Sequence, residues 1–194
     1  MSESLSTAVT VEHEFAATPK AVWVTLSDPV TTRDELPECT GLEPADGRDL
    51  PVGSLARLLA ADEATRDART VSLGEEYDAT VGASVRNVGV EIDVGVTVTE
   101  RDYPDMAIEG DIGGDDAEAS MEATLTVDER DDEGCRVTWR AAADVGGPLA
   151  TYGRRPVESA VARVANDFFA AVDARLAACD GPESERAVTD PDWP

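Results

Sequence analysis

The feature that most constrains the fold is a run of apolar residues at every second position between 88 and 98. Five valines and one isoleucine occupy these positions, with Gly, Glu, Asp, Gly and Thr between them. This alternation predicts a long strand with one apolar and one polar face, which is typical of an antiparallel sheet. Such a strand needs neighbours on both sides and a cover for its apolar face.

Neighbouring strands are predicted before and after this run. Residues 7–15 and 77–85 alternate in the same way, and another strand starts near 106. The clearest pair is a hairpin, in which alternate apolar positions of 119–127 and 135–143 flank a charged loop. We therefore expect a curved antiparallel sheet of about six to seven strands.

The cover is predicted at the end of the chain, where apolar residues recur at spacings of three and four between 149 and 178. They are Val157, Val161, Val164, Phe168, Val172 and Leu176. Two short helices should follow the first strand, because Thr18-Pro19 is a typical helix start and Pro37 a helix stop. The expected fold class is α+β, with the sheet wrapped around a long C-terminal helix.

No linker divides this order of elements. We expect one domain over residues 7–179, an insertion at 47–72 with a short amphipathic helix, and a flexible acidic tail at 180–194. A chain of 194 residues can bury about two-thirds of its unfolded surface. It therefore needs no disulfide or metal to fold.

The charge is strongly acidic, with 41 Asp and Glu against 16 Lys and Arg, a net charge of -25, and Lys20 as its only lysine. In molar salt the Debye length falls to about 3 Å, so that self-repulsion is screened. The charge predicts a protein of a high-salt organism. An acidic protein of ordinary salt is the alternative, which the scarcity of lysine disfavours. Nucleic acid is excluded as a partner because its phosphates would be repelled.

The location predicted from the sequence is the cytoplasm. Cys39, Cys135 and Cys179 are odd in number and far apart, which favours reduced thiols over a disulfide framework. The N-terminus lacks the basic and apolar regions of a signal peptide. No apolar stretch reaches 18 residues, so we expect no integral membrane segment.

The residues that usually carry chemistry are scarce. His13 is the only histidine, and with three scattered cysteines it cannot form a zinc site of ordinary spacing. We favour a position at the edge of the core for His13 over a proton relay. Cys39 lacks a basic neighbour that would activate it, and Gly146-Gly147 lacks phosphate-loop spacing. We expect no catalytic residue, no metal and no cofactor.

Four segments carry a family resemblance: FAATPKAVWVTLSDP at 15–29, LPECTGLEP at 36–44, YDATV at 77–81, and ADVGGPLATYG at 143–153 with ANDFFAAVDARL after it. They resemble the carbon monoxide dehydrogenase CoxG family, within the SRPBCC/START-like helix-grip superfamily. The resemblance covers most of residues 9–178. The chain departs from the family at Arg86-Asn87, where Gly-Pro is common, and it lacks the C-terminal membrane anchor of longer members.

The resemblance implies non-enzymatic binding of a hydrophobic small molecule, a quinone or lipid, in a cavity between sheet and helix. It also implies dehydrogenase subunits of the molybdenum hydroxylase class as partners, with at most transient membrane contact. The expected lining takes apolar residues from the inner faces of the strands, the helix above them, and the mouth of the cavity. These residues are Leu36, Cys39, Val81, Ile92, Ile108, Met121, Leu125, Val137, Trp139, Leu149, Tyr152, Val157, Val161 and Phe168.

Two other functions stay open. A polyketide cyclase or aromatase would need polar side chains directed into the cavity, and the apolar faces carry almost none besides His13. A ligand-free assembly factor for a dehydrogenase would have a filled interior. On balance the sequence favours a binding protein over an enzyme.

Overall fold

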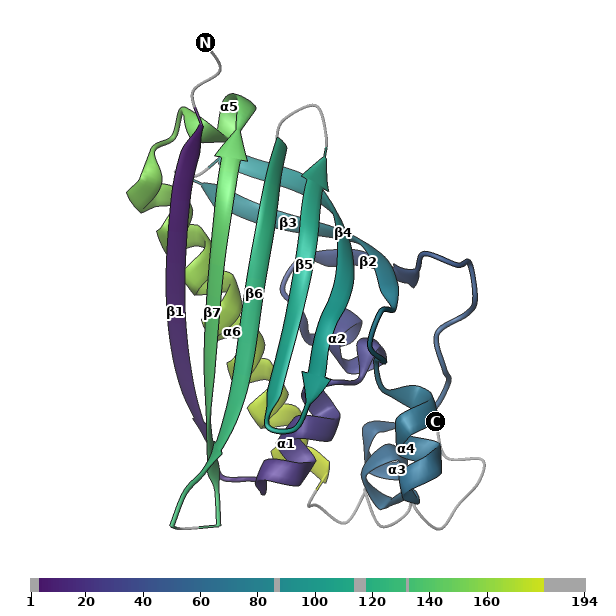
Figure 1. The fold of residues 1–194 in the computed structure, drawn as a ribbon. Coiled ribbons are helices and arrows are strands. Elements are labelled where there is room, and N and C mark those ends of the chain that lie inside the picture. Colours follow the sequence, from purple (N-terminus) through teal and green to yellow (C-terminus); the bar gives the residue numbers. More distant parts are fainter. Residues whose placement is uncertain (1–3, 86–87, 114–117, 132, 180–194) are drawn as a thin grey trace.

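A seven-stranded antiparallel sheet forms the frame of the protein, in the order β1-β7-β6-β5-β4-β3-β2 (Figure 1). The computed structural model describes residues 4–85, 88–113, 118–131 and 133–179. The strands are β1 (Leu5–Phe15), β2 (Cys39–Pro44), β3 (Glu76–Val85), β4 (Val88–Asp102), β5 (Asp105–Gly113), β6 (Glu118–Glu129) and β7 (Cys135–Gly146). The predicted fold class is confirmed.

The strand register places alternate residues on one inner face. Leu125 of β6 lies opposite Trp139 of β7, which lies opposite Val11 of β1. Predicted strand 88–98 is the first part of β4, which continues to Asp102. Strand β2 was not predicted, because it is short and its register shifts between Cys39 and Gly41, which breaks the alternation.

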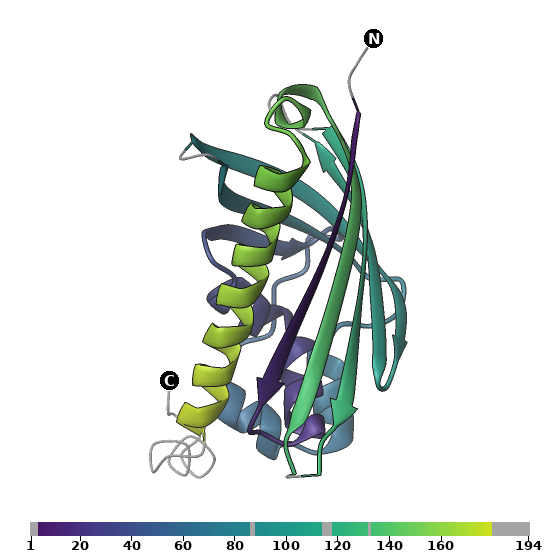
Figure 2. The ribbon, with the colours of Figure 1, turned by 90° about the vertical axis from the view of Figure 1, so that its left-hand side faces the viewer.

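The long helix α6 (Arg154–Cys179) lies across the inner face of the sheet (Figure 2). Its C-terminal half buries Phe169, Val172 and Leu176 in the main core. The helix predicted from residue 149 is divided in the structure into α5 (Gly147–Ala150) and α6, with Gly153 between them at a φ of 84°. Pro156 lies in the first turn of α6, where a missing N–H removes no helical hydrogen bond.

Two short helices follow β1 as predicted. Helix α1 (Pro19–Leu26) is capped by Thr18, whose hydroxyl accepts from the Ala21 N–H at 3.4 Å. Helix α2 (Pro29–Glu35) is capped by Asp28, whose carboxylate accepts from the Val30 and Thr31 N–H groups, each at 3.3 Å. These caps satisfy N–H groups that have no partner within the helix.

The insertion contains two helices, where one was expected. The amphipathic one is α3 (Leu55–Ala60), and α4 (Glu63–Arg69) follows it. Helix α4 has no buried residue, and its sequence carries no apolar stripe from which it could have been predicted. It begins at a cap in which the Asp62 carboxylate accepts from the Thr65 N–H at 2.8 Å. Both helices lie beside α1, at the end of the molecule opposite α5 (Figures 1 and 2).

The predicted tail at 180–194 and the Arg86-Asn87 turn lie outside the described residues. In the part of the chain that the structure describes, no helix is both long and apolar enough to cross a membrane.

Candidate ligand site between the sheet and the long helix

The inner face of the sheet changes in side-chain size from one end to the other. Around α1, the interior holds Phe15, Phe169 and Leu176, together with Trp139 and Leu125. Toward α5, the inward positions from β1 to β4 carry Ala, Gly, Val and a few larger residues, and Tyr77 of β3 lies opposite Val96. By strand register these are Val9, Ala141, Ala123 and Ile108, then Thr7, Ala143, Met121, Gly110 and Val96, then Leu5, Val145, Ala119, Ile112 and Val94.

Helix α6 also presents small side chains at this end. Val157 and Ala160 are buried, and Val161 and Val164 are half-buried. Gly110 leaves room for Met121, because a Cβ at Gly110 would lie 3.0 Å from the Met121 Cγ. The spacing between a helix and a sheet is set by the largest side chains between them, so small ones opposite each other leave unfilled space.

The burial of the inward side chains varies along the inner face of the sheet. Phe15 and Val137 have no exposed surface, and Phe169 keeps 2%. Toward α5, by contrast, several side chains point inward and are nevertheless only half-buried: Ile92, Val94, Val96, Ile112, Met121 and Ala143. Leu125 and Trp139, which pack against the main core, are half-buried as well. The inner face is therefore most completely buried around Phe15 and Phe169, and apolar residues such as Ile92 and Ile112 keep accessible surface toward α5.

The predicted lining residues fall into two groups. Leu125, Val137, Trp139 and Phe168 belong to the main core or pack against it. Ile92, Leu149 and Tyr152 belong to a smaller apolar cluster toward α5, around Ala119 and Val145. The remaining inward residues are Val81 on β3, Ile108 on β5, Met121 on β6, and Val157 and Val161 on α6. Val137 has no exposed surface, so it is a core residue and not part of a ligand lining.

Leu36 and Cys39 lie where α2 leads into β2, and both are half-buried. Cys39 lies opposite Val81 in the sheet, and its thiol donates to the Gly41 carbonyl at 3.3 Å. Burial raises the pKa of the Cys39 thiol above its usual value, although the Gly41 contact and the charge of Arg33 act in the opposite direction. The thiol is therefore protonated near neutral pH, which suits a lining residue better than a nucleophile.

His13 lies near α1 in a three-ring cluster with Phe15 and Phe169, at centroid distances of 4.7 and 6.1 Å from them. Its Nε2 is 3.7 Å from a carboxylate oxygen of Asp173 on α6. Cys135 is fully buried nearby, and burial raises its pKa to about 11. A protonated, inaccessible thiol cannot act as a nucleophile, so these residues hold β1 and β7 against α6. Within the described ranges, no group of three or more His, Cys, Asp or Glu residues could hold a metal.

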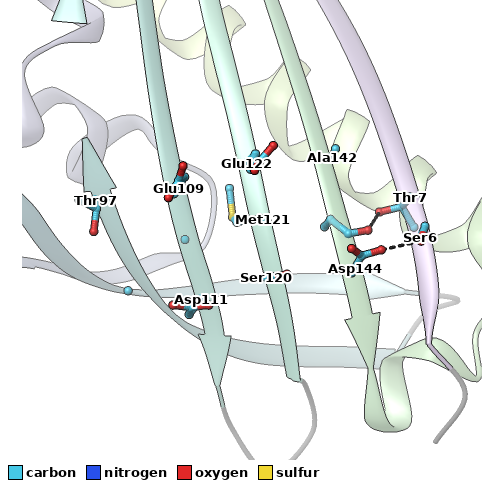
Figure 3. Close-up of a pocket in the computed structure, with 13 residues that line it drawn as sticks. Ser6, Thr7, Thr97, Glu109, Asp111, Ser120, Met121, Glu122, Ala142 and Asp144 are labelled. Atoms are coloured by element: carbon cyan, nitrogen blue, oxygen red, sulfur yellow. Dashed lines mark hydrogen bonds between the residues drawn. The ribbon is translucent and has the colours of Figure 1, made fainter. Parts of the chain in front are cut away.

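Two hollows of about 380 and 670 Å³ lie on the outer face of the sheet, and they share Gly95 and Asp111. The residues around the first are drawn in Figure 3, and Met121 is the only member of the predicted lining among them. Its charged residues are Glu109, Asp111, Glu122 and Asp144. Carboxylates of this density do not suit an apolar molecule. The sequence analysis missed these hollows, whose only sequence signal is the acidic alternation on the polar face.

The lining predicted from sequence was also incomplete. Val94, Val96, Ile112 and Ala143 are inward and half-buried, yet they were not among the predicted residues. Their signal was present, since Val94 and Val96 belong to the alternation that predicted β4. Alternation shows which face a residue occupies, but it does not show where along the strand the interior is left unfilled.

Comparison with known proteins identifies the family. The model of the carbon monoxide dehydrogenase CoxG family matches residues 68–177, which is more than half of the chain. No curated protein matches the chain.

Several solved structures share the fold. A conserved protein from Geobacillus kaustophilus has a TM-score of 0.65 and 20% identity, covering 90% of this chain and 97% of that one. A protein from Thermus thermophilus has a TM-score of 0.60 and 14% identity, covering 90% and 99%. A START superfamily protein from Mycobacterium smegmatis has a TM-score of 0.57 and 14% identity, covering 88% and 97%. The fold is thus START-like, and the chain belongs to the carbon monoxide dehydrogenase CoxG family.

Proposed function

We propose that this protein is a non-enzymatic carrier or accessory protein that binds a quinone or lipid-like molecule between the sheet and the N-terminal half of α6. The observation that carries the proposal is the accessible surface that inward apolar residues such as Ile92 and Ile112 keep toward α5, where α6 presents small side chains, whereas Phe15 and Val137 keep none. A ligand-free assembly factor would have no need for unfilled apolar space.

The energetics fit a reversible carrier. Burial of apolar surface contributes about 25 cal/mol per Å². A micromolar dissociation constant corresponds to about 8 kcal/mol. A ligand that buries roughly 300 Å² of apolar surface would reach this affinity before the costs of immobilisation are subtracted. Such a ligand would be held firmly enough to be carried and weakly enough to be released.

Family membership supports a connection to dehydrogenases of the carbon monoxide dehydrogenase type. We propose their subunits as partners, with transient membrane contact where an apolar ligand is exchanged. The net charge of -25 supports a place in the cytoplasm of a high-salt organism.

The test is native mass spectrometry and organic extraction of the protein purified from its own host. Met121→Trp and Val161→Trp would fill the space from the sheet and from the helix. Ser120→Trp is the matched control, because Ser120 is the neighbour of Met121 on the outer face. We expect a bound quinone or lipid in the wild type and in the control, and its loss in both filling variants.

Two results would contradict the proposal. A ligand that survives both filling variants would place the binding site elsewhere. An empty wild-type protein that still co-purifies with dehydrogenase subunits would instead establish the assembly factor.

A further inference from the structure

The two edge strands of the sheet differ in length and regularity. Strand β2 has 6 residues, and its register shifts between Cys39 and Gly41, which interrupts the row of backbone groups at that edge. Strand β1 has 11 residues and pairs with β7 over its whole length without a shift. In Figure 2 the outer edge of β1 faces the viewer, with α6 beside it. Strand β1 is therefore the long and regular edge of the sheet.

The backbone groups at this edge belong to the even-numbered residues of β1. The Ala8 N–H donates to a carboxylate oxygen of Glu158 on α6 at 3.3 Å, so it points away from β7. Successive residues of a strand direct their N–H and C=O groups to opposite sides. Ser6, Thr10 and Glu12 therefore present both groups on the same side as Ala8, and their residues are exposed.

The side chains in the first part of β1 leave this edge open to another strand. Natural edge strands are kept from pairing with other chains by charged residues, proline or bulges. Residues 5–11, with the sequence LSTAVTV, contain no charged residue and no proline, although 29% of the chain is charged. They are rich in Val and Thr, which favour strands. The carboxylate of Glu158 covers one N–H of this stretch, that of Ala8.

Strand β1 is complementary to a second copy of itself. Two identical strands can pair antiparallel about a two-fold axis. With the axis at Thr10, all 11 residues are paired, and each acidic residue lies opposite a small neutral one. The opposed pairs include Glu12 with Ala8, Glu14 with Ser6, and Val9 with Val11. An axis at Glu12 would instead oppose two carboxylates, which destabilises a pair of strands.

We propose that the edge of β1 is the interaction surface for a second copy of this chain, whose own β1 extends the sheet across the dimer. The two-fold axis passes through Thr10. Glu158 covers the Ala8 N–H in the monomer and is displaced when the two strands pair. Each copy carries a net charge of -25, so the dimer forms in molar salt, where the repulsion is screened, and dissociates as the salt is lowered.

The test is sedimentation equilibrium of the full-length protein in molar salt. Thr10→Pro removes an N–H that points away from β7, so it leaves the β1–β7 pairing intact and blocks pairing between copies. Thr10→Val is the matched control, because it keeps the N–H and suits a strand. Circular dichroism checks that both variants fold.

We expect a dimer in the wild type and in Thr10→Val, and a dissociation constant raised by about 10-fold or more in Thr10→Pro. Glu158→Ala should lower the dissociation constant by about 3- to 10-fold, because it removes the competing acceptor. Hydrogen exchange of the wild type gives a readout that needs no variant. The Thr10 and Glu12 amides should exchange more slowly as the protein concentration rises, whereas Thr40 on β2 should not respond.

Three results would overturn the proposal. The first is a wild-type protein that stays monomeric at millimolar concentration in molar salt. The second is a dimer that Thr10→Pro leaves intact, because its interface would then lie elsewhere. The third is exchange at Thr10 and Glu12 that does not change with concentration, and this result decides the matter even where Thr10→Pro fails to fold.

Discussion

Asp28 is a fully buried carboxylate whose oxygens are engaged by five donors. The Val30 and Thr31 N–H groups and the Thr31 hydroxyl donate from α2, the hydroxyl at 2.8 Å. Arg69 donates twice, from Nε at 3.1 Å and from Nη2 at 2.8 Å. Arg69 also donates to the Gly53 carbonyl at 2.7 Å. A buried charge is tolerated when its partners are this complete.

Arg69→Met should therefore be strongly destabilising, because it leaves the Asp28 charge buried without its counter-ion. We expect a loss of about 3–5 kcal/mol in the free energy of unfolding, measured by urea denaturation in molar salt. Arg33→Met is the control, since the Arg33–Asp34 pair is largely exposed and should contribute less than about 1 kcal/mol. Adding Asp28→Asn to Arg69→Met should restore part of the lost free energy of unfolding, because it removes the unpaired charge. Equal effects of the Arg69 and Arg33 changes would show that the buried pair is not a stabilising contact.

At the scale of elements, the insertion is part of the core and not a lid. Helix α3 contributes Leu55 and Leu58 to the main core, which also contains Val22 and Leu26 of α1. Arg69 at the end of α4 fixes the insertion to the junction of α1 and α2. The insertion thus packs at the α1 end of the molecule, and α3 and α4 do not cover the end toward α5 (Figure 1).

Leu55→Ala should accordingly cost about 2–5 kcal/mol, the usual range for removing a buried leucine. Leu73→Ala is the control, because Leu73 lies just beyond the insertion and is 67% exposed. It should change the stability by less than about 0.5 kcal/mol. Chemical denaturation measures both variants. A Leu55→Ala protein as stable as the control would mean that the insertion only decorates the fold.

At the scale of the whole molecule, charge is unevenly distributed over the outer face of the sheet. On the β1–β7 side, Glu14 pairs with Arg136 at 2.8 Å and with Arg130 at 3.1 Å. Nearer the centre, Glu109 of β5 lies directly opposite Glu122 of β6. Like charges in directly opposed positions destabilise a sheet, and salt screens their repulsion.

Transfer from molar to millimolar salt should therefore unfold or expand the protein, which far-ultraviolet circular dichroism would detect. Glu109→Gln should raise the melting temperature at low salt and change it little in molar salt. Glu14→Gln should lower the melting temperature at low salt, because it removes an attractive contact. A spectrum unchanged by salt, or equal shifts in both variants, would contradict a high-salt role for the surface charge.

The elements that could be predicted from sequence are those with strong local periodicity. The alternation of β4, the β6–β7 hairpin and the apolar stripe of α6 each depend on residues close in the chain, so a single sequence reveals them. Four short segments predicted the resemblance to the CoxG family, and the match of the family model to residues 68–177 confirms it. Strand β2 and helix α4 were missed because the one is short and bulged and the other is polar on every side.

The sequence by itself determined the faces of the strands, the covering helix and the excess of acidic residues. Only the tertiary structure decided where the insertion packs, since Asp28 and Arg69 are 41 residues apart in the chain. Likewise, only the strand register brings small residues of four strands together beneath the small residues of α6. Unfilled space depends on the summed volumes of side chains from distant segments, and no local pattern contains that sum.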